Sequence, residues 1–186
     1  MVFLDVVVVA LLVALALGGR PSELGKLEAR RLWLVFVAMA IQVVAFPSGL
    51  PWTTPDSVAV ALWLVSYGFL MAAAWSNRRI PGVVVMSLGL LSNLIAIVVN
   101  GGHMPVLPEA LAATGHDYDV HNNSIQIAEP HFSWLVDRWG APEWVPLANV
   151  FSVGDVLIAA GLAIAVIVGS RPRAFRALAV WRAQRA

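Results

Sequence analysis

The stretch IPGVVVMSLGLLSNLIAIVVNGGHMP, Ile80–Pro105, holds a long apolar run that contains a single amide, Asn93. Pro81 favours the start of a helix, because proline suits the first helical position. The run Asn100-Gly101-Gly102 favours its end, because glycine readily adopts the left-handed conformation that closes a helix. The pattern therefore predicts an apolar helix over 81–100 whose polar end reaches a membrane surface.

Four more apolar runs accompany this helix, and the composition is that of a membrane protein. Hydrophobic residues make up 60% of the 186 residues and charged residues only 12%, whereas soluble domains are about 25% charged. Runs of this kind are typical of membrane spans. We predict an all-α membrane protein, one transmembrane domain of residues 1–186, with five helices at about 2–17, 32–46, 58–75, 81–100 and 153–168.

The basic residues predict how such a bundle is oriented. Except for Arg138, every lysine and arginine lies in 20–31, in 76–79 or in the tail that begins at Arg171. Because basic residues accumulate in cytoplasmic loops, the N-terminus is predicted outside and the C-terminus in the cytoplasm. Asp5 and the lack of a basic residue before the first run argue against a cleaved signal peptide. The lipid bilayer is then the first expected partner, and a net charge of +1 gives no reason to expect nucleic acid.

The extracytoplasmic segment 101–152 contains all four histidines. A short helix is predicted over 108–114 and an irregular polar stretch over 116–129. A second helix is predicted over 130–139, because Phe132, Leu135, Val136 and Trp139 follow the i, i+3, i+4, i+7 spacing of one apolar face. This helix is expected either to lie in the outer membrane interface, with Trp144 as a further anchor, or to cover the bundle as a lid.

Several polar residues are predicted to reach a similar depth at the outer end of the bundle. Ionisable groups in a membrane suggest a functional site, but amides also hold helices together. Ser152 and Asp155 have the spacing of a capping box, which gives Asp155 a purely structural alternative role. The candidate cluster, either a pocket or packing contacts, comprises Asp5, Gln42, Asn100, His103 and Asp155 at this depth, together with Asn93 about 10 Å further in.

A metal site is a weaker candidate. In an extended segment Asp117, Asp119 and His121 would point the same way, and carboxylates with imidazole suit zinc. No histidine pair has the helical i, i+4 spacing of common zinc motifs, so a solvated loop is the alternative. We predict no cofactor, because the spans contain no histidine for haem and the chain contains no cysteine.

Two signatures resemble an uncharacterised bacterial integral membrane family, domain of unknown function 5317. They are Asn100–Val106 (NGGHMPV), followed by Pro108–Leu111, and Val150–Ile158 (VFSVGDVLI). The resemblance implies a protein of the bacterial cytoplasmic (inner) membrane with several spans. It also implies that any site lies where the fourth span ends and the fifth begins, at Asn100, His103, Met104, Ser152 and Asp155. The segment 121–146 departs from the family pattern, so the resemblance implies no role for His121 or His131.

Three functions are compatible with these features, and whether the protein is an enzyme stays open. The leading interpretation is an accessory, assembly or scaffold subunit of a bacterial membrane complex, bound to other membrane subunits or to its own copies, because no catalytic motif is recognisable. The second is an enzyme or binding protein for a lipid or quinone-like substrate in the outer leaflet. The third is an oligomeric small-solute transporter, although no inverted repeat is visible.

Overall fold

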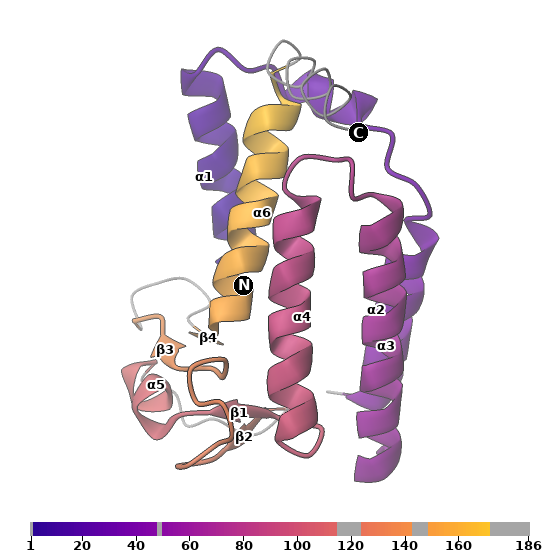
Figure 1. Ribbon diagram of the computed structural model, residues 1–186, viewed down its shortest axis with the longest axis vertical. Coiled ribbons are helices and arrows are strands. Elements are labelled where there is room, and N and C mark those ends of the chain that lie inside the picture. The colour runs from indigo at the N-terminus through magenta and orange to yellow at the C-terminus, as the bar shows by residue number, and fades with distance from the viewer. Residues whose placement is uncertain (1, 48–49, 115–123, 143–148, 172–186) are drawn as a thin grey trace.

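The computed structural model describes residues 2–47, 50–114, 124–142 and 149–171, and its long helices run roughly along one direction (Figure 1). Short strands and a short helix gather at one end. The helices are α1 (Val2–Ala16), the 3-10 helix η1 (Pro21–Lys26), α2 (Trp33–Ala45), α3 (Asp56–Ser76), α4 (Val83–Val99), α5 (Pro108–Ala113) and α6 (Val153–Gly169). The strands are β1 (Met104–Val106), β2 (Ser124–Gln126), β3 (Trp139–Gly140) and β4 (Val150–Phe151).

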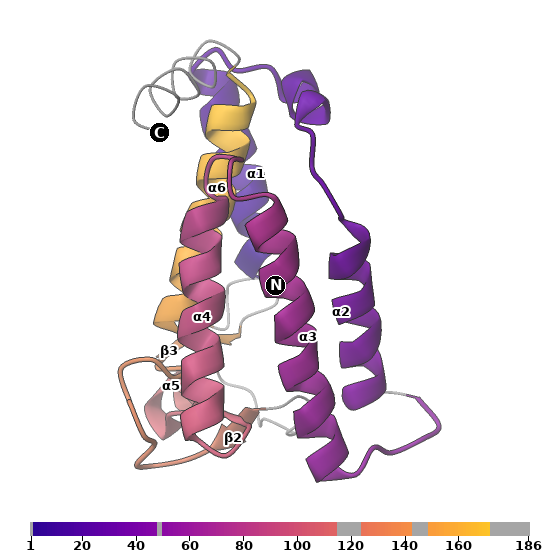
Figure 2. The same ribbon diagram turned by 45° about the vertical axis from the view of Figure 1, so that its right-hand side comes forward.

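The long helices pack in the order α1, α6, α4, α3, α2. The closest pairs are α4 with α6 and α2 with α3, and α4 joins the two groups through α3. Figure 2 shows the α2–α3 pair standing beside the α4–α6 pair. The basic connection η1, the turn between α3 and α4 and the end of α6 lie at the end opposite the strands.

The predicted bundle of five transmembrane helices is wrong. Within the described ranges only α3, with 21 residues, is long and apolar enough to cross a membrane. The other apolar helices stop too early: α2 has 13 residues, about 20 Å at 1.5 Å per residue, against a hydrocarbon core of about 30 Å. Backbone geometry ends them, since Phe46 leaves the helical conformation and Gly82 and Gly101 adopt positive φ at the two ends of α4.

The fold is also not purely helical, because two small sheets form at the strand end. β1 pairs with β2 in parallel, and β3 pairs with β4 in antiparallel. The strand β2 lies within 116–129, the stretch that the sequence predicts to be irregular. The short helix predicted over 108–114 is confirmed as α5. The core under these strands consists of Tyr67, Ala96, Ile97, Met104, Leu135 and Val136.

The predicted helix over 130–139 is wrong. The chain turns at 131–135 and then enters β3, and Phe132 has a positive φ of 51° that no helix permits. The reason is a partner far away in sequence. The backbone N–H of Leu107 donates to the Asp137 carbonyl at 2.9 Å, and the Asp137 N–H donates to the Pro105 carbonyl at 3.0 Å. These bonds replace the local ones that a helix would make.

Asn100 anchors this segment to the end of α4. Its side-chain oxygen accepts from the His131 N–H at 2.8 Å, and its Nδ2 donates to the His131 carbonyl at 3.0 Å. The same Nδ2 lies 2.8 Å from the carbonyl of Ala96. An asparagine side chain thus completes the backbone bonding of two segments that are 31 residues apart.

Replacing Asn100→Ala should release the segment 131–137 without unfolding the helices. Loss of two hydrogen bonds at about 1 kcal/mol each should make hydrogen exchange in this segment roughly thirtyfold faster. Exchange measured by mass spectrometry should rise in the peptide that contains His131. Asn77→Ala is the matched control, because Asn77 makes the same reciprocal pair with Arg30 at the opposite end. Equal exchange in wild type and Asn100→Ala would refute this anchoring role.

Candidate functional site

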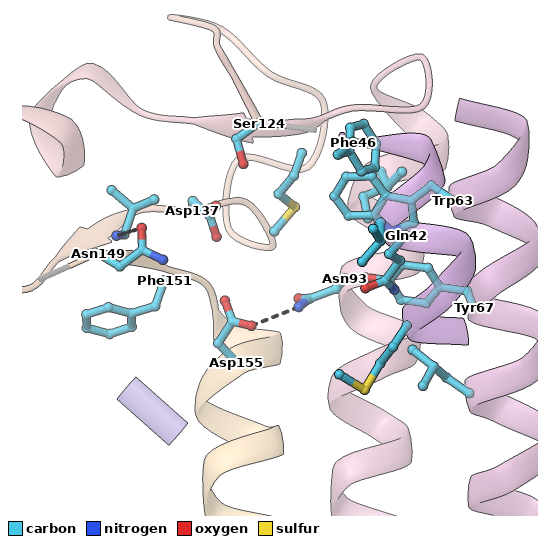
Figure 3. Close-up of a pocket in the computed structure, with 16 residues that line it drawn as sticks. Gln42, Phe46, Trp63, Tyr67, Asn93, Ser124, Asp137, Asn149, Phe151 and Asp155 are labelled. Atoms are coloured by element: carbon cyan, nitrogen blue, oxygen red, sulfur yellow. Dashed lines mark hydrogen bonds between the residues drawn. The ribbon is translucent and has the colours of Figure 1, made fainter. Parts of the chain in front are cut away.

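A cavity of about 670 Å³ lies between the α2–α3 pair and the α4–α6 pair, next to the strand end (Figure 3). Two carboxyl groups and several amides reach it, together with aromatic and aliphatic side chains. The lining residues are Met39, Gln42, Val43, Phe46, Trp63, Tyr67, Leu70, Asn93, Ile97, Met104, Ser124, Asp137, Asn149, Val150, Phe151 and Asp155.

Asp155 is held at the start of α6 by a capping box with Ser152. The Ser152 Oγ accepts from the Asp155 N–H at 3.1 Å, and the Ser152 N–H donates to the Asp155 carboxylate at 2.9 Å. The Asn93 side chain adds a hydrogen bond from α4, with its Nδ2 3.1 Å from Asp155 Oδ1. Ser152 Oγ also lies 2.9 Å from Asn93 Oδ1. Asp155 therefore caps α6 and at the same time faces the cavity.

Glycines allow α4 and α6 to approach closely enough for this contact. A Cβ on Gly89 would lie 2.9 Å from the backbone nitrogen of Ile158, and one on Gly154 would lie 2.7 Å from the Gly89 carbonyl oxygen. Further along, a Cβ on Gly161 would lie 2.6 Å from the Gly82 carbonyl oxygen. Small residues let helix backbones touch in this way, which brings Asn93 within reach of Ser152 and Asp155.

Asp137 is the second carboxyl group of the cavity and reaches it from the strand end. Its backbone pairs with β1, and its side chain is only 6% exposed. Burial and, to a smaller extent, the nearby negative charge of Asp155 together raise the pKa of Asp137 to about 8. Asp137 therefore holds a proton at neutral pH when the cavity contains no ligand.

Aromatic side chains form the opposite wall, on α2 and α3. The rings of Phe46 and Trp63 meet edge to face at 4.8 Å between centroids, and Trp63 stacks on Tyr67 at 6.3 Å. Gln42 donates to Ser66 at 3.0 Å, and Ser66 donates to the Trp63 carbonyl at 2.7 Å. The buried indole N–H of Trp63 lies near the Tyr67 hydroxyl but makes no hydrogen bond of good geometry to a described residue, so a polar ligand atom could satisfy it.

The structure brings some of the sequence-predicted residues together and separates others. Gln42, Asn93, Met104 and Asp155 line the cavity, and Ser152 lies behind Asp155. The described lining does not include three of the candidates. Asn100 bonds His131, His103 lies 3.4 Å from the Asp56 carboxylate, and Asp5 is exposed on α1.

The metal candidates Asp117, Asp119 and His121 lie outside the described residues, as do Trp144 and the basic tail beyond Arg171. Within 2–47, 50–114, 124–142 and 149–171, no group of three histidine or acidic side chains is arranged to hold a metal ion. His103 and Asp56 form a pair at the start of α3.

Sequence reasoning missed Asp137, Trp63 and Tyr67. Asp137 falls in the segment predicted as a helix, where it would occupy the polar face. One signal could have identified it: it is an acidic residue directly after the apolar pair Leu135-Val136, in a segment with no other carboxylate between 130 and 139. Trp63 and Tyr67 lie four residues apart on α3 and therefore on one helix face, a spacing that suits an aromatic wall.

Comparison with known proteins places the chain in a family. Residues 26–167 match a family of unknown function, DUF5317. The chain belongs to this family. The chain is also similar to an uncharacterised protein from Thermotoga maritima, with 30% identity over 173 residues that cover 90% of this chain and 92% of that protein. No solved structure matches. The predicted membership of the chain in this family is thereby confirmed.

Proposed function

We propose that this DUF5317 protein is a membrane-associated binding protein that holds a small amphipathic ligand, lipid-like or quinone-like, in the cavity. The cavity itself carries the proposal. Its volume of about 670 Å³ lies in the range of known small-molecule sites, roughly 300–1,000 Å³. One wall is aromatic and aliphatic, while the facing wall carries Asp137 and Asp155. Such a lining suits a ligand with an apolar body and a polar group.

Association with a membrane is supported by α3, which is apolar and long enough to cross one. Many large apolar side chains also point outward, among them Phe36 on α2, which is 67% exposed. A soluble protein rarely leaves such faces uncovered. An amphipathic ligand could therefore reach the cavity from the lipid phase.

Binding is favoured over catalysis by the placement of the candidate acid–base residues. The histidine nearest to the strand end of α4, His103, pairs with Asp56 rather than with Asp155. Asp155 is committed to the capping box and to Asn93. Among the described lining residues, no hydroxyl group donates a hydrogen bond to a histidine in the way that an activated nucleophile would.

The test is the small-molecule content of the purified protein. Val43→Trp places an indole at the cavity, whereas Val44→Trp, the matched control, adds the same side chain at a neighbouring exposed position that does not line it. After purification in mild detergent, solvent extracts are compared by mass spectrometry. Because a bulky side chain fills the binding space, a co-purified molecule should fall about fivefold or more in Val43→Trp alone.

Equal amounts in the two tryptophan variants would exclude the cavity as the binding site. Each variant must first show wild-type thermal unfolding, so that loss of the molecule cannot arise from misfolding. A wild-type protein that carries no molecule beyond bulk lipid and detergent would overturn the proposal.

A second candidate function, an accessory subunit of a membrane complex, is favoured by the outward apolar faces of α1 and α2. Leu12 on α1 and Phe36 on α2 are both more than half exposed. Purification from the native membrane followed by mass spectrometry of the accompanying proteins tests it. A partner that is lost in Phe36→Ser but kept in Leu12→Ser would identify the α2 face as its contact, and the reverse result would identify α1.

A further inference from the structure

The charge of the cavity is unbalanced. Its lining contains the carboxyl groups of Asp137 and Asp155, and no lysine, arginine or histidine is among the described lining residues. The Asn93 amide already donates to Asp155, and the Gln42 amide to Ser66. The wall formed by α4, α6 and the strand end therefore presents acceptors and negative charge to whatever enters.

Asp137 is the group most in need of a partner. It is 6% exposed and points into the cavity beside Ser124 in Figure 3. Among the described residues, none donates a hydrogen bond to its carboxyl group or forms an ion pair with it. A buried polar group without a partner is costly, and a buried charge even more so. A cation or a strong donor on a ligand would remove that cost.

The aromatic wall faces these carboxyl groups across the cavity. Phe46, Trp63 and Tyr67 form one continuous set of rings on α2 and α3. Ring faces attract cations, tryptophan most strongly, and pockets for quaternary ammonium groups combine such rings with negative charge. Anions and purely apolar groups would gain nothing from the carboxylates.

We propose that the ligand of this cavity carries a cationic head group, a protonated amine or a quaternary ammonium, bound between Asp137 and Asp155 and the rings of Trp63 and Tyr67. This inference rests on the proposed binding function and specifies the ligand class for the same site. Asp137 supplies the buried counter-charge, Asp155 supplies a second carboxylate fixed by its capping box, and the rings complete the enclosure.

Binding of a cation should be coupled to release of a proton. The pKa of Asp137 is about 8 in the empty cavity, and the charged form is the one that a cation stabilises. The titratable groups that face it are Asp155 from α6 and Tyr67 from α3. For a ligand of constant charge, affinity should rise about tenfold between pH 7 and pH 9, as the fraction of ionised Asp137 grows.

The experiment compares choline with its neutral isostere 3,3-dimethylbutan-1-ol, in which carbon replaces the charged nitrogen. Titration calorimetry on the full chain in mild detergent gives both affinities at pH 7 and pH 9. Choline should bind at least tenfold more tightly than the isostere, and more tightly at the higher pH. Asp137→Asn should reduce the preference for choline and abolish the pH dependence, while Asp56→Asn, which alters an exposed carboxylate outside the lining, should change neither.

The outcomes separate this inference from the function on which it rests. If the isostere binds as well as choline, or if affinity falls as the pH rises, the cationic head group is excluded while ligand binding stands. A falling affinity would show that protonated Asp137 donates a hydrogen bond to the ligand hydroxyl instead. If neither compound binds and Val43→Trp retains every co-purified molecule, both proposals fail. Folding of Asp137→Asn is checked by its thermal unfolding, and Trp63→Leu gives a second variant that should weaken choline selectively.

Discussion

Replacing Gly161→Ala should destabilise the protein by about 3 kcal/mol, the upper range for overpacking a tight contact. The added Cβ would lie 2.6 Å from the Gly82 carbonyl oxygen and 2.7 Å from the backbone nitrogen of Met86. Both are backbone atoms of the opposing segment, so no side-chain rotation relieves the clash. α4 and α6 must then move apart. This movement also weakens the Asn93–Asp155 hydrogen bond near the start of α6.

Gly68→Ala is the matched control within α3. Nothing lies within 4 Å of a Cβ at this position, and alanine favours a helix by about 1 kcal/mol over glycine. Thermal unfolding followed by circular dichroism in one detergent should therefore move in opposite directions for the two variants. A Gly161→Ala protein as stable as wild type would mean that close backbone packing of α4 on α6 contributes little to the fold.

Asp137→Asn should make the protein more stable at alkaline pH and leave it unchanged in acid. In the folded protein burial raises the pKa of Asp137 from 3.8 to about 8. Between those two values the unfolded chain has lost the proton and the folded chain retains it. The wild type therefore loses stability as the pH rises from about 4 to about 8, by of order 1 kcal/mol per pH unit, and the loss is complete above that range.

Asparagine has the same shape and no titratable proton, so the variant should lack this slope. The free energy of unfolding of Asp137→Asn should exceed that of wild type by an amount that increases from pH 5 to pH 7 and pH 9. Asp56→Asn serves as the control, because the Asp56 side chain is 77% exposed. Parallel pH profiles of wild type and Asp137→Asn would show that Asp137 is ionised and solvated in the folded protein.

Features with local causes could be predicted from the sequence. The end of α4 follows from Asn100 and from the two glycines after it, Gly101 and Gly102, which both adopt positive φ. The start of α6 follows from Ser152 and Asp155, whose capping box forms as their spacing predicts. The short helix α5 follows from Pro108 at its first position. In each case the contacts that fix the helix end lie within a few residues of it, so the local sequence is sufficient to predict that end.

The length of the apolar helices was less predictable. Hydropathy marks where apolar residues occur, but helix ends depend on backbone conformation at single residues such as Phe46 and Gly82. Three helices, α1, α2 and α4, end one or two residues inside the predicted bounds, whereas α3 (Asp56–Ser76) and α6 (Val153–Gly169) extend slightly beyond them. Among the described residues only α3 reaches the length required to cross a bilayer.

The residues of the candidate site could likewise be predicted only in part from the sequence. Gln42, Asn93, Met104 and Asp155 could be selected from the sequence because they are polar or distinctive within apolar surroundings, and they line the cavity. Asn100 and His103 have the same appearance in sequence, yet Asn100 bonds the backbone of His131 and His103 lies against Asp56. Which of two similar residues faces a cavity depends on helix rotation and on partners elsewhere in the chain.

By itself the sequence determined the family, the apolar character of the helices, the capping of α4 and α6 and the clustering of basic residues at one end. Only the tertiary structure decided that 131–140 is not a helix and that Asp137 is buried in a cavity opposite Trp63. The physical reason is that these features depend on pairing between 105–107 and 137 and on the close approach of α4 and α6. Such long-range contacts outweigh local periodicity, because they satisfy buried backbone groups that a helix would satisfy within itself.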